Sequence, residues 1–272
     1  MASPDPLHLV DIAANLQNGS FRADLALTLA RARAAGVIAM VVPGSDVADS
    51  VAGIELCRAH ADTLVCTLGV HPHHAKSCDD DTIPTLRAHA REAPVVAIGE
   101  CGLDFFRDIS PRDVQERWFA AQIALACELQ LPLYMHERDA HVRFQAMLAP
   151  HRARFPRGVV HCFTGDEAAL RAYLDLDLHI GITGWICDER RGLHLRDLVR
   201  LVPADRLMIE TDAPYLIPRS IRPKPKTTRN EPAFLPWVLD AVAECRGESR
   251  ERVAERSTAV AGAFFGLAQT GR

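Results

Sequence analysis

The sequence predicts an α/β fold, a single-domain (β/α)8 TIM barrel with extra helices at its C-terminal end. Eight short apolar, β-branched runs alternate along the chain with stretches of helical spacing. The runs are mostly continuous rather than alternating, which is typical of parallel strands covered on both faces. The length of 272 residues is near the ~250 residues of such a barrel. No linker-like composition divides the chain, so we expect one domain over residues 1–272.

The predicted strands are separated by gaps long enough for the crossover helices that parallel strands require. They cover residues 7–12, 37–42, 63–70, 94–99, 131–135, 157–161, 178–183 and 205–211.

The stretch from Phe21 to Gly36 illustrates a predicted helix. Asn18, Gly19 and Ser20 offer a cap before it, and Gly36 is suited to end it. Further helices are expected at 111–130, 138–150, 233–245, 249–256 and 258–267.

Composition indicates an ordinary globular protein, with 48% hydrophobic and 24% charged residues. The net charge of −4 gives no overall attraction to nucleic acid, so polyanion binding would need a local basic patch. Eight cysteines without a CxxC pair indicate reduced thiols. Neither a secretory leader nor a membrane span is evident. We expect a cytoplasmic protein with no membrane partner.

Four of the predicted strands end in a residue that can bind a metal or move a proton: Glu100, His136, His161 and Asp212. The carboxyl ends of parallel barrel strands converge on one face, so these side chains can meet there. Two carboxylates and two imidazoles suit Zn²⁺, Mn²⁺ or Mg²⁺. A lone histidine at a strand end is more often structural, but four such ends are a less accidental arrangement.

Two further segments lie at predicted strand ends. His71 and His73 flank Pro72, which would hold the two imidazoles in fixed directions for substrate contact or proton transfer. A solvated loop is the alternative. Asp104 follows Glu100 and either orients a ligating histidine or only shapes its loop.

Basic residues offer candidate phosphate contacts. Arg138 could grip a phosphate, or it could pair with Glu137 or Asp139. The proline-rich segment 218–232 could hold a nucleic-acid backbone, although charge runs are more often solvated loops. Its basic residues are Arg219, Arg222, Lys224, Lys226 and Arg229.

Seven segments together resemble the TatD family of metal-dependent nucleases. They are GVHPH (69–73), AIGECGLDF (97–105), MHERDA (135–140), VHCFTG (160–165), GITGW (181–185), IETDAPYL (209–216) and RNEP (229–232). The resemblance covers nearly the whole chain. It implies a TIM barrel that hydrolyses phosphodiester bonds with a divalent metal.

The resemblance also implies roles for individual residues. Glu100, His136 and His161 match the family's metal ligands, and Asp212 matches the strand-end aspartate that binds metal or activates water. His71 matches a histidine beside metal and substrate. The family motifs also contain Asp104, Arg138 and Glu231, and we expect Asp104 and Glu231 to support the ligands.

One departure from the wider superfamily concerns the first strand. A DxHxH motif is usual there, whereas this chain has Ala13 and Asn15 in place of the two histidines. Losing two imidazoles shifts the expected cofactor toward Mg²⁺, with Mn²⁺ and Zn²⁺ as alternatives.

The segments DIAANL (11–16), CDERRGL (187–193) and RNEP are similar to the bacterial branch of the family. That branch implies a 3′–5′ exonuclease acting on single-stranded DNA or RNA, linked to DNA repair. We expect such strands as substrate and a monomeric enzyme. Two alternatives remain: an amidohydrolase or D-aminoacyl-tRNA deacylase, and a non-catalytic nucleic-acid-binding protein.

Overall fold

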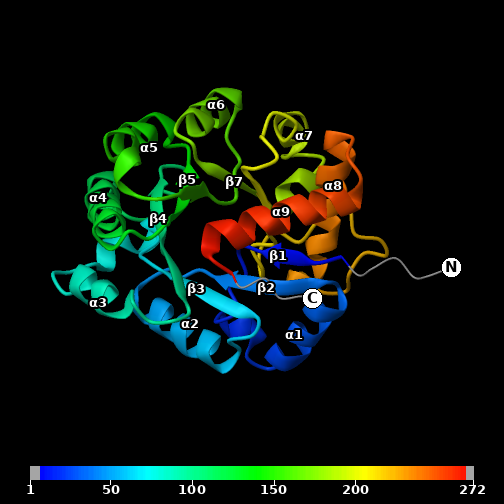
Figure 1. Cartoon of the computed structure of the whole chain (residues 1–272), viewed down its shortest axis with the longest axis horizontal. Coiled ribbons are helices and arrows are strands. Elements are labelled where there is room, and N and C mark those ends of the chain that lie inside the picture. Colours follow the sequence, from blue (N-terminus) through cyan, green and yellow to red (C-terminus); the bar gives the residue numbers. More distant parts are fainter. Residues whose placement is uncertain (1–6, 268–272) are drawn as a thin grey trace. The chain divides into compact units, whose positions relative to one another are not determined.

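The computed structural model describes residues 7–267 and contains eight parallel strands in chain order from β1 to β8 (Figure 1). With helices between consecutive strands, this is the predicted (β/α)8 TIM barrel. The strands are Leu9–Asp11 (β1), Val37–Val42 (β2), Leu64–Leu68 (β3), Val95–Asp104 (β4), Leu133–Arg138 (β5), Gly158–Val160 (β6), His179–Ile182 (β7) and Leu207–Ile209 (β8).

The α-helices are Leu25–Ala34 (α1), Val47–Ala59 (α2), Thr82–His89 (α3), Arg112–Leu129 (α4), His141–Leu148 (α5), Glu167–Asp175 (α6), Leu193–Leu198 (α7), Leu235–Arg246 (α8) and Arg250–Phe265 (α9). Short 3₁₀ helices are Gly19–Phe21 (η1), Pro72–Ser77 (η2), Ala149–Arg154 (η3), Gly184–Cys187 (η4) and Pro232–Phe234 (η5). None of the helices in the described chain is long and apolar enough to cross a membrane.

Two helix predictions need correction. The expected cap at Asn18 serves η1, because its side chain accepts the backbone N–H of Ser20 at 2.9 Å, and α1 begins only at Leu25. The two helices expected over 249–256 and 258–267 are the single helix α9. Buried Ser257 remains helical, with its hydroxyl donating to the carbonyl of Ala254.

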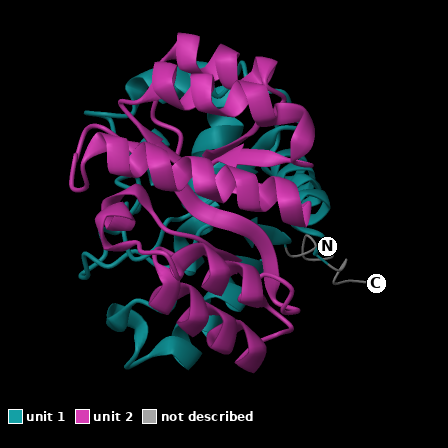
Figure 2. Cartoon of the chain, turned by 90° about the vertical axis from the view of Figure 1, so that its left-hand side faces the viewer, with its two compact units in different colours: residues 1–40, 182–272 teal, residues 41–181 magenta. Residues whose placement is uncertain are grey.

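The chain forms two compact units, drawn in different colours in Figure 2. The first contains residues 1–40 and 182–272. Within it β8 lies beside β1: the backbone N–H of Asp212 donates to the carbonyl of Ala13 at 2.9 Å, and Ala14 bridges to Ala213. This contact brings the first and last strands of the chain together.

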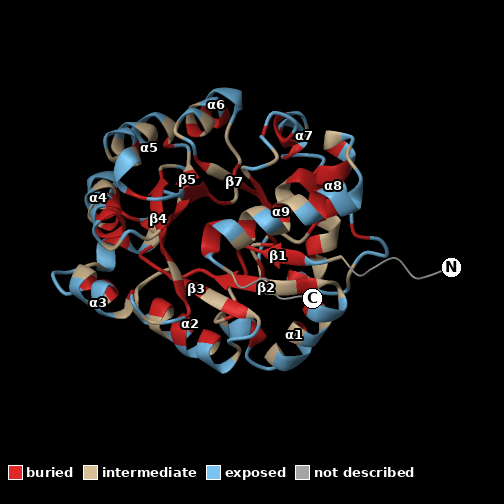
Figure 3. Ribbon diagram, in the orientation of Figure 1, coloured by how far each residue is buried: buried red, intermediate tan, exposed pale blue. Residues whose placement is uncertain are grey.

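The second unit covers residues 41–181 and contains β3 to β7 except the last residue of β7. In Figure 3 its helices carry buried residues on one face and exposed residues on the other. On the inner side of α4 and α5, the rings of Phe119 and Phe144 stack at 5.1 Å, and both are buried. Burying such a side chain contributes about 1.5–3 kcal/mol.

Strands β4 and β5 extend beyond their predicted ends at 99 and 135, because their pairing continues to Asp104 and Arg138. Glu100 and His136 therefore lie inside strands rather than just after them. β4 also contains a bulge. Ile98 pairs with Leu133 and Cys101 pairs with Met135, so β4 advances by three residues where β5 advances by two.

Gly99 makes the bulge sterically feasible. Its φ is +139°, and a Cβ atom there would lie 1.9 Å from the carbonyl oxygen of Tyr134.

Candidate active site

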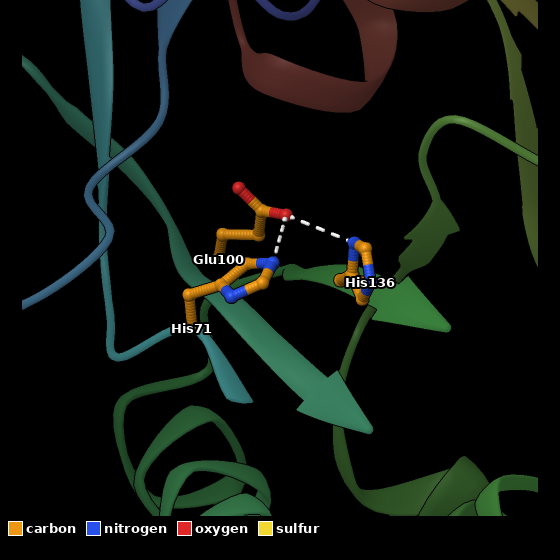
Figure 4. A group of neighbouring side chains, drawn as sticks. All are labelled: His71, Glu100 and His136. Carbon is orange, nitrogen blue, oxygen red and sulfur yellow. Dashed lines mark ion pairs between the residues drawn. The ribbon is translucent and has the colours of Figure 1, made fainter. Parts of the chain in front are cut away.

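The centre of the candidate site is one carboxylate oxygen surrounded by three imidazole nitrogens. Oε1 of Glu100 lies 2.7 Å from Nε2 of His161, 3.3 Å from Nε2 of His71 and 3.3 Å from Nδ1 of His136. Figure 4 shows the contacts to His71 and His136. All four side chains belong to the second unit, and they come from four consecutive strand ends or strands. These contacts bring together Glu100, His136 and His161, three of the four residues predicted to meet, and their role as metal ligands stays a prediction.

Backbone hydrogen bonds position these residues. The carbonyls of Gly44 and Ser45, just after β2, accept the N–H groups of Glu100 and His71, each at 2.9 Å. The buried amide of Gln122 on α4 bonds both the N–H and the carbonyl of Val70, the residue before His71. The ends of β3 and β4 are thus held in fixed relation to each other.

His71 has a defined tautomer. Its Nδ1 accepts the backbone N–H of His73 at 3.1 Å, so a proton on the neutral ring must sit on Nε2. That nitrogen faces Glu100. His71 therefore presents an N–H donor to the site, whereas a metal ligand would have to present a lone pair there.

Asp104 fixes the opposite tautomer in His136. Oδ2 of Asp104 lies 3.2 Å from Nε2 of His136 and 2.7 Å from Nε2 of His73. A proton on Nε2 of His136 leaves a lone pair on Nδ1, the nitrogen that faces Glu100. Asp104 is itself held by Gln115 on α4, whose amide bonds both its N–H and its carbonyl.

The protonation states follow from burial and neighbours. Burial lowers the pKa of His71 to about 4, so this ring is neutral at pH 7. For Glu100, burial would raise the pKa, but His161, His71 and His136 outweigh it and hold that pKa well below its usual range. Burial likewise opposes ionisation of Asp104, and the hydrogen bonds from His136 and His73 lower its pKa.

The donor set fits a divalent metal ion. Within residues 7–267, ligand atoms of His71, Glu100 and His136 lie within 4.8 Å of one another. Nε2 of His161 hydrogen-bonds the same carboxylate oxygen at 2.7 Å. The assignment of Glu100, His136 and His161 as metal ligands stays a prediction. Imidazole nitrogens and carboxylate oxygens are ligand types that suit Mg²⁺, Mn²⁺ or Zn²⁺.

Asp212 lies in the first unit, three residues after the end of β8, with a φ of +55°. Its Oδ1 accepts the side-chain amide of Asn15 at 3.2 Å, and the same amide donates to the carbonyl of Ala213. Asn15 thus acts as a donor that orients Asp212, a role that the sequence alone did not indicate. The assignment of Asp212 as a metal ligand stays a prediction.

The predicted residues of the RNEP segment form a charge cluster within the first unit. Arg229 bonds both carboxylate oxygens of Asp24, at 2.7 and 2.8 Å. Glu231 accepts three hydrogen bonds from two nitrogens of Arg31, the shortest at 2.6 Å. These contacts join α1 to the segment before η5. The expected roles of Arg229 in substrate binding and of Glu231 in supporting the ligands stay predictions.

The other predicted basic residues differ in their surroundings. Arg222, Lys224 and Lys226 are exposed, and the guanidinium of Arg222 donates to the carbonyls of Arg219 and Ile221. The guanidinium of Arg138 lies over the ring of Phe106, 4.7 Å from its centroid. Glu137, the expected alternative partner, instead accepts the hydroxyl of Tyr173.

Two important residues were not recognised from the sequence, Gln115 and Gln122. They are seven residues apart, which places them on one face of α4, and both are buried. Buried amides on an otherwise apolar helix face are a detectable signal, since such groups need partners.

Comparisons with known proteins identify the family of this chain. The family model described as TatD related DNase matches residues 10–266. A 3′-5′ ssDNA/RNA exonuclease TatD of Pantoea ananatis is 49% identical over 259 residues, covering 95% of this chain and all of that protein. A protein of the same name from Klebsiella pneumoniae is 46% identical over 259 residues, covering 95% and 98% of the two chains.

Among solved structures, YJJV, a TatD homolog from Escherichia coli, has a TM-score of 0.87 at 27% identity, covering 96% of this chain and 98% of its own. The match to the family model extends over nearly all of the sequence and includes every residue of the carboxylate and imidazole cluster. This chain therefore belongs to the TatD related DNase family.

Proposed function

We propose that this protein is a metal-dependent hydrolase that removes nucleotides from the 3′ end of single-stranded DNA or RNA. The observation that carries the proposal is the cluster around Oε1 of Glu100 in a chain nearly half identical to proteins named as such exonucleases. A divalent cation there would acidify water and neutralise charge on a phosphoryl oxygen.

The side chains of the cluster have different roles in this proposal. Glu100, His136 and His161 would hold the cation. His71, neutral with its proton on Nε2, donates a hydrogen bond to a phosphoryl oxygen and so favours the charge that develops there. Asp104 keeps the lone pair of His136 directed into the site.

We propose Mg²⁺ as the cation, following the loss of two imidazoles at Ala13 and Asn15. The remaining imidazoles also suit Mn²⁺ and Zn²⁺. Assignment of the chain as one domain, the monomeric state, the cytoplasmic location and the link to DNA repair stay predictions from the sequence.

The test uses the purified full chain and two single strands, one labelled at the 5′ end and one at the 3′ end. With Mg²⁺, the 5′-labelled strand should shorten in single-nucleotide steps, and the 3′-labelled strand should release a labelled mononucleotide at once. EDTA should stop both reactions.

Glu100→Gln keeps the shape of the side chain and removes its charge, so activity should fall at least about 100-fold. Glu128→Gln, at an exposed ion pair with Arg87, is the matched control and should retain activity. Cleavage only at internal positions would contradict the exonuclease proposal. Intact strands together with release of a D-amino acid from charged tRNA would favour the deacylase. Binding of single strands without any turnover would favour a non-catalytic nucleic-acid-binding protein.

A further inference from the structure

An exposed aromatic ring lies directly beside the candidate site. Phe106 follows β4 by two residues and is 57% exposed. Single exposed apolar residues are common on protein surfaces and need no explanation. This one differs because the guanidinium of Arg138 lies over its ring, at 4.7 Å from the centroid.

The carboxylate of Asp104 connects this ring to the site. One oxygen, Oδ1, accepts the backbone N–H groups of Phe106 and Arg107 at 3.1 and 2.8 Å. The other oxygen, Oδ2, contacts His136 at 3.2 Å. Arg138 is two residues beyond His136 on β5, and its carbonyl accepts the N–H of Phe105. The ring and the guanidinium are therefore anchored to the same residues that form the site.

The loop that carries Phe106 is fixed at its far end as well. The hydroxyl of Ser110 donates to the carbonyl of His73 at 2.9 Å and accepts the backbone N–H of Lys76 at 3.1 Å. The side-chain amide of Gln115 donates to the carbonyl of Ser110. An exposed ring on a loop held in this way is ordered before a ligand arrives, which reduces the entropic cost of binding.

The charge around the ring suits a polyanion. Arg107 is exposed, and Lys76 donates to the carbonyl of Ile109, so three cations including Arg138 surround the loop. The acidic residue at the tip of this loop, Asp108, forms an ion pair with Arg112 at 2.9 Å. An aromatic face bordered by cations is the combination that binds single-stranded nucleic acid by base stacking and phosphate contact.

We propose that Phe106 stacks on a nucleobase next to the bond that is cleaved, with Arg138 supporting the ring and contacting the adjoining phosphate. This inference rests on the proposed function, because it assigns a base-binding position to that same site. Stacking of this kind tolerates any base, so the position contributes affinity without sequence preference.

The experiment compares Phe106→Ala and Phe106→Tyr on two substrates. One is an ordinary single strand, and the other carries abasic sites in its last two nucleotides. For the ordinary strand, Phe106→Ala should raise KM about tenfold, since one stacked base contributes roughly that much affinity. Phe106→Tyr should stay close to the wild type, because it retains the ring. On the abasic strand the wild type and Phe106→Ala should be equal.

Leu201→Ala is the matched control. Leu201 is an apolar side chain, 43% exposed, in the segment before β8. Leu201→Ala should leave the KM for both strands unchanged. An unchanged KM for Phe106→Ala would overturn the proposal. So would an equal loss on the abasic strand, which would show that the ring only supports the loop.

A binding measurement separates failure of this inference from failure of the proposed function. A strand with 2-aminopurine in its last position, titrated in EDTA, should lose fluorescence with the wild type and not with Phe106→Ala. Quenching by the wild type without any strand cleavage would refute the exonuclease proposal alone. Cleavage with identical quenching by both proteins would refute the stacking position alone.

Discussion

Asp104→Asn tests whether an acceptor behind His136 controls metal binding. In the wild type, Oδ2 of Asp104 faces Nε2 of His136, and Oδ1 accepts the N–H groups of Phe106 and Arg107. The asparagine must keep its single oxygen on those two N–H groups, so its NH₂ group would face His136. A donor at that position makes Nε2 an acceptor and moves the proton to Nδ1, the nitrogen that faces Glu100.

The expected magnitude follows from this change of tautomer. Loss of a residue that orients a metal ligand typically costs 10–100-fold in metal affinity, which corresponds to about 1.4–2.8 kcal/mol. Because the substitution affects metal binding, the metal concentration that gives half-maximal activity should rise. The turnover rate at saturating metal should change much less.

The assay is a titration of activity and of binding heat with Mn²⁺. The matched control is Asp108→Asn, which removes an exposed carboxylate of the same loop that pairs with Arg112. A half-saturating Mn²⁺ concentration that is the same for Asp104→Asn, Asp108→Asn and the wild type would refute the reasoning. A large loss of turnover with unchanged metal affinity would instead indicate that Asp104 acts on the substrate.

The remaining predictions concern stability and substrate binding. Burial raises the pKa of Asp11 to about 7 from 3.8, so the native state retains a proton that the unfolded chain loses, and stability should fall as the pH rises from about 4 to 7. In the wild type the hydroxyl of Thr211 donates to Asp11, and in Asp11→Asn the amide can donate to that hydroxyl instead. The variant should lose this pH dependence of stability, which is on the order of 4 kcal/mol. Urea unfolding at pH 5 and pH 8 measures it, and an equal loss of stability in the wild type and the variant would contradict the prediction. Replacing Arg222, Lys224 and Lys226 with alanine should reduce the slope of log affinity against log salt by about 2, at roughly 0.7 per charge on single strands. An unchanged slope would remove this loop from the substrate path.

Hydrophobic periodicity was sufficient to predict the barrel, because continuous β-branched runs separated by helical stretches leave few other architectures. All eight predicted strands are present, although β4 and β5 extend further than expected. Their ends were misjudged because polar residues such as Glu100 and Glu137 look like loop residues, whereas here strand pairing continues through them. Charge inside a strand is tolerated where a site supplies partners.

The sequence was sufficient to predict which side chains meet at Glu100, but not how they are protonated. Glu100, His136 and His161 were identifiable from strand ends and from the family resemblance. That His71 donates while His136 offers a lone pair depends on which atom lies behind each ring, the N–H of His73 or the carboxylate of Asp104. No sequence pattern records this. The same holds for Phe106, whose exposure depends on how its loop is anchored.

The bulge in β4 has a consequence for how chains of this kind can change in length. Side chains alternate between the two faces of a strand, so one residue more or fewer between Ile98 and Cys101 would turn the carboxylate of Glu100 to the other face. Such an insertion or deletion would leave the apolar core composition intact and still remove the centre of the site. Length variation should therefore be absent from this short stretch, while the exposed segment 222–228 can gain or lose residues with little effect on the fold.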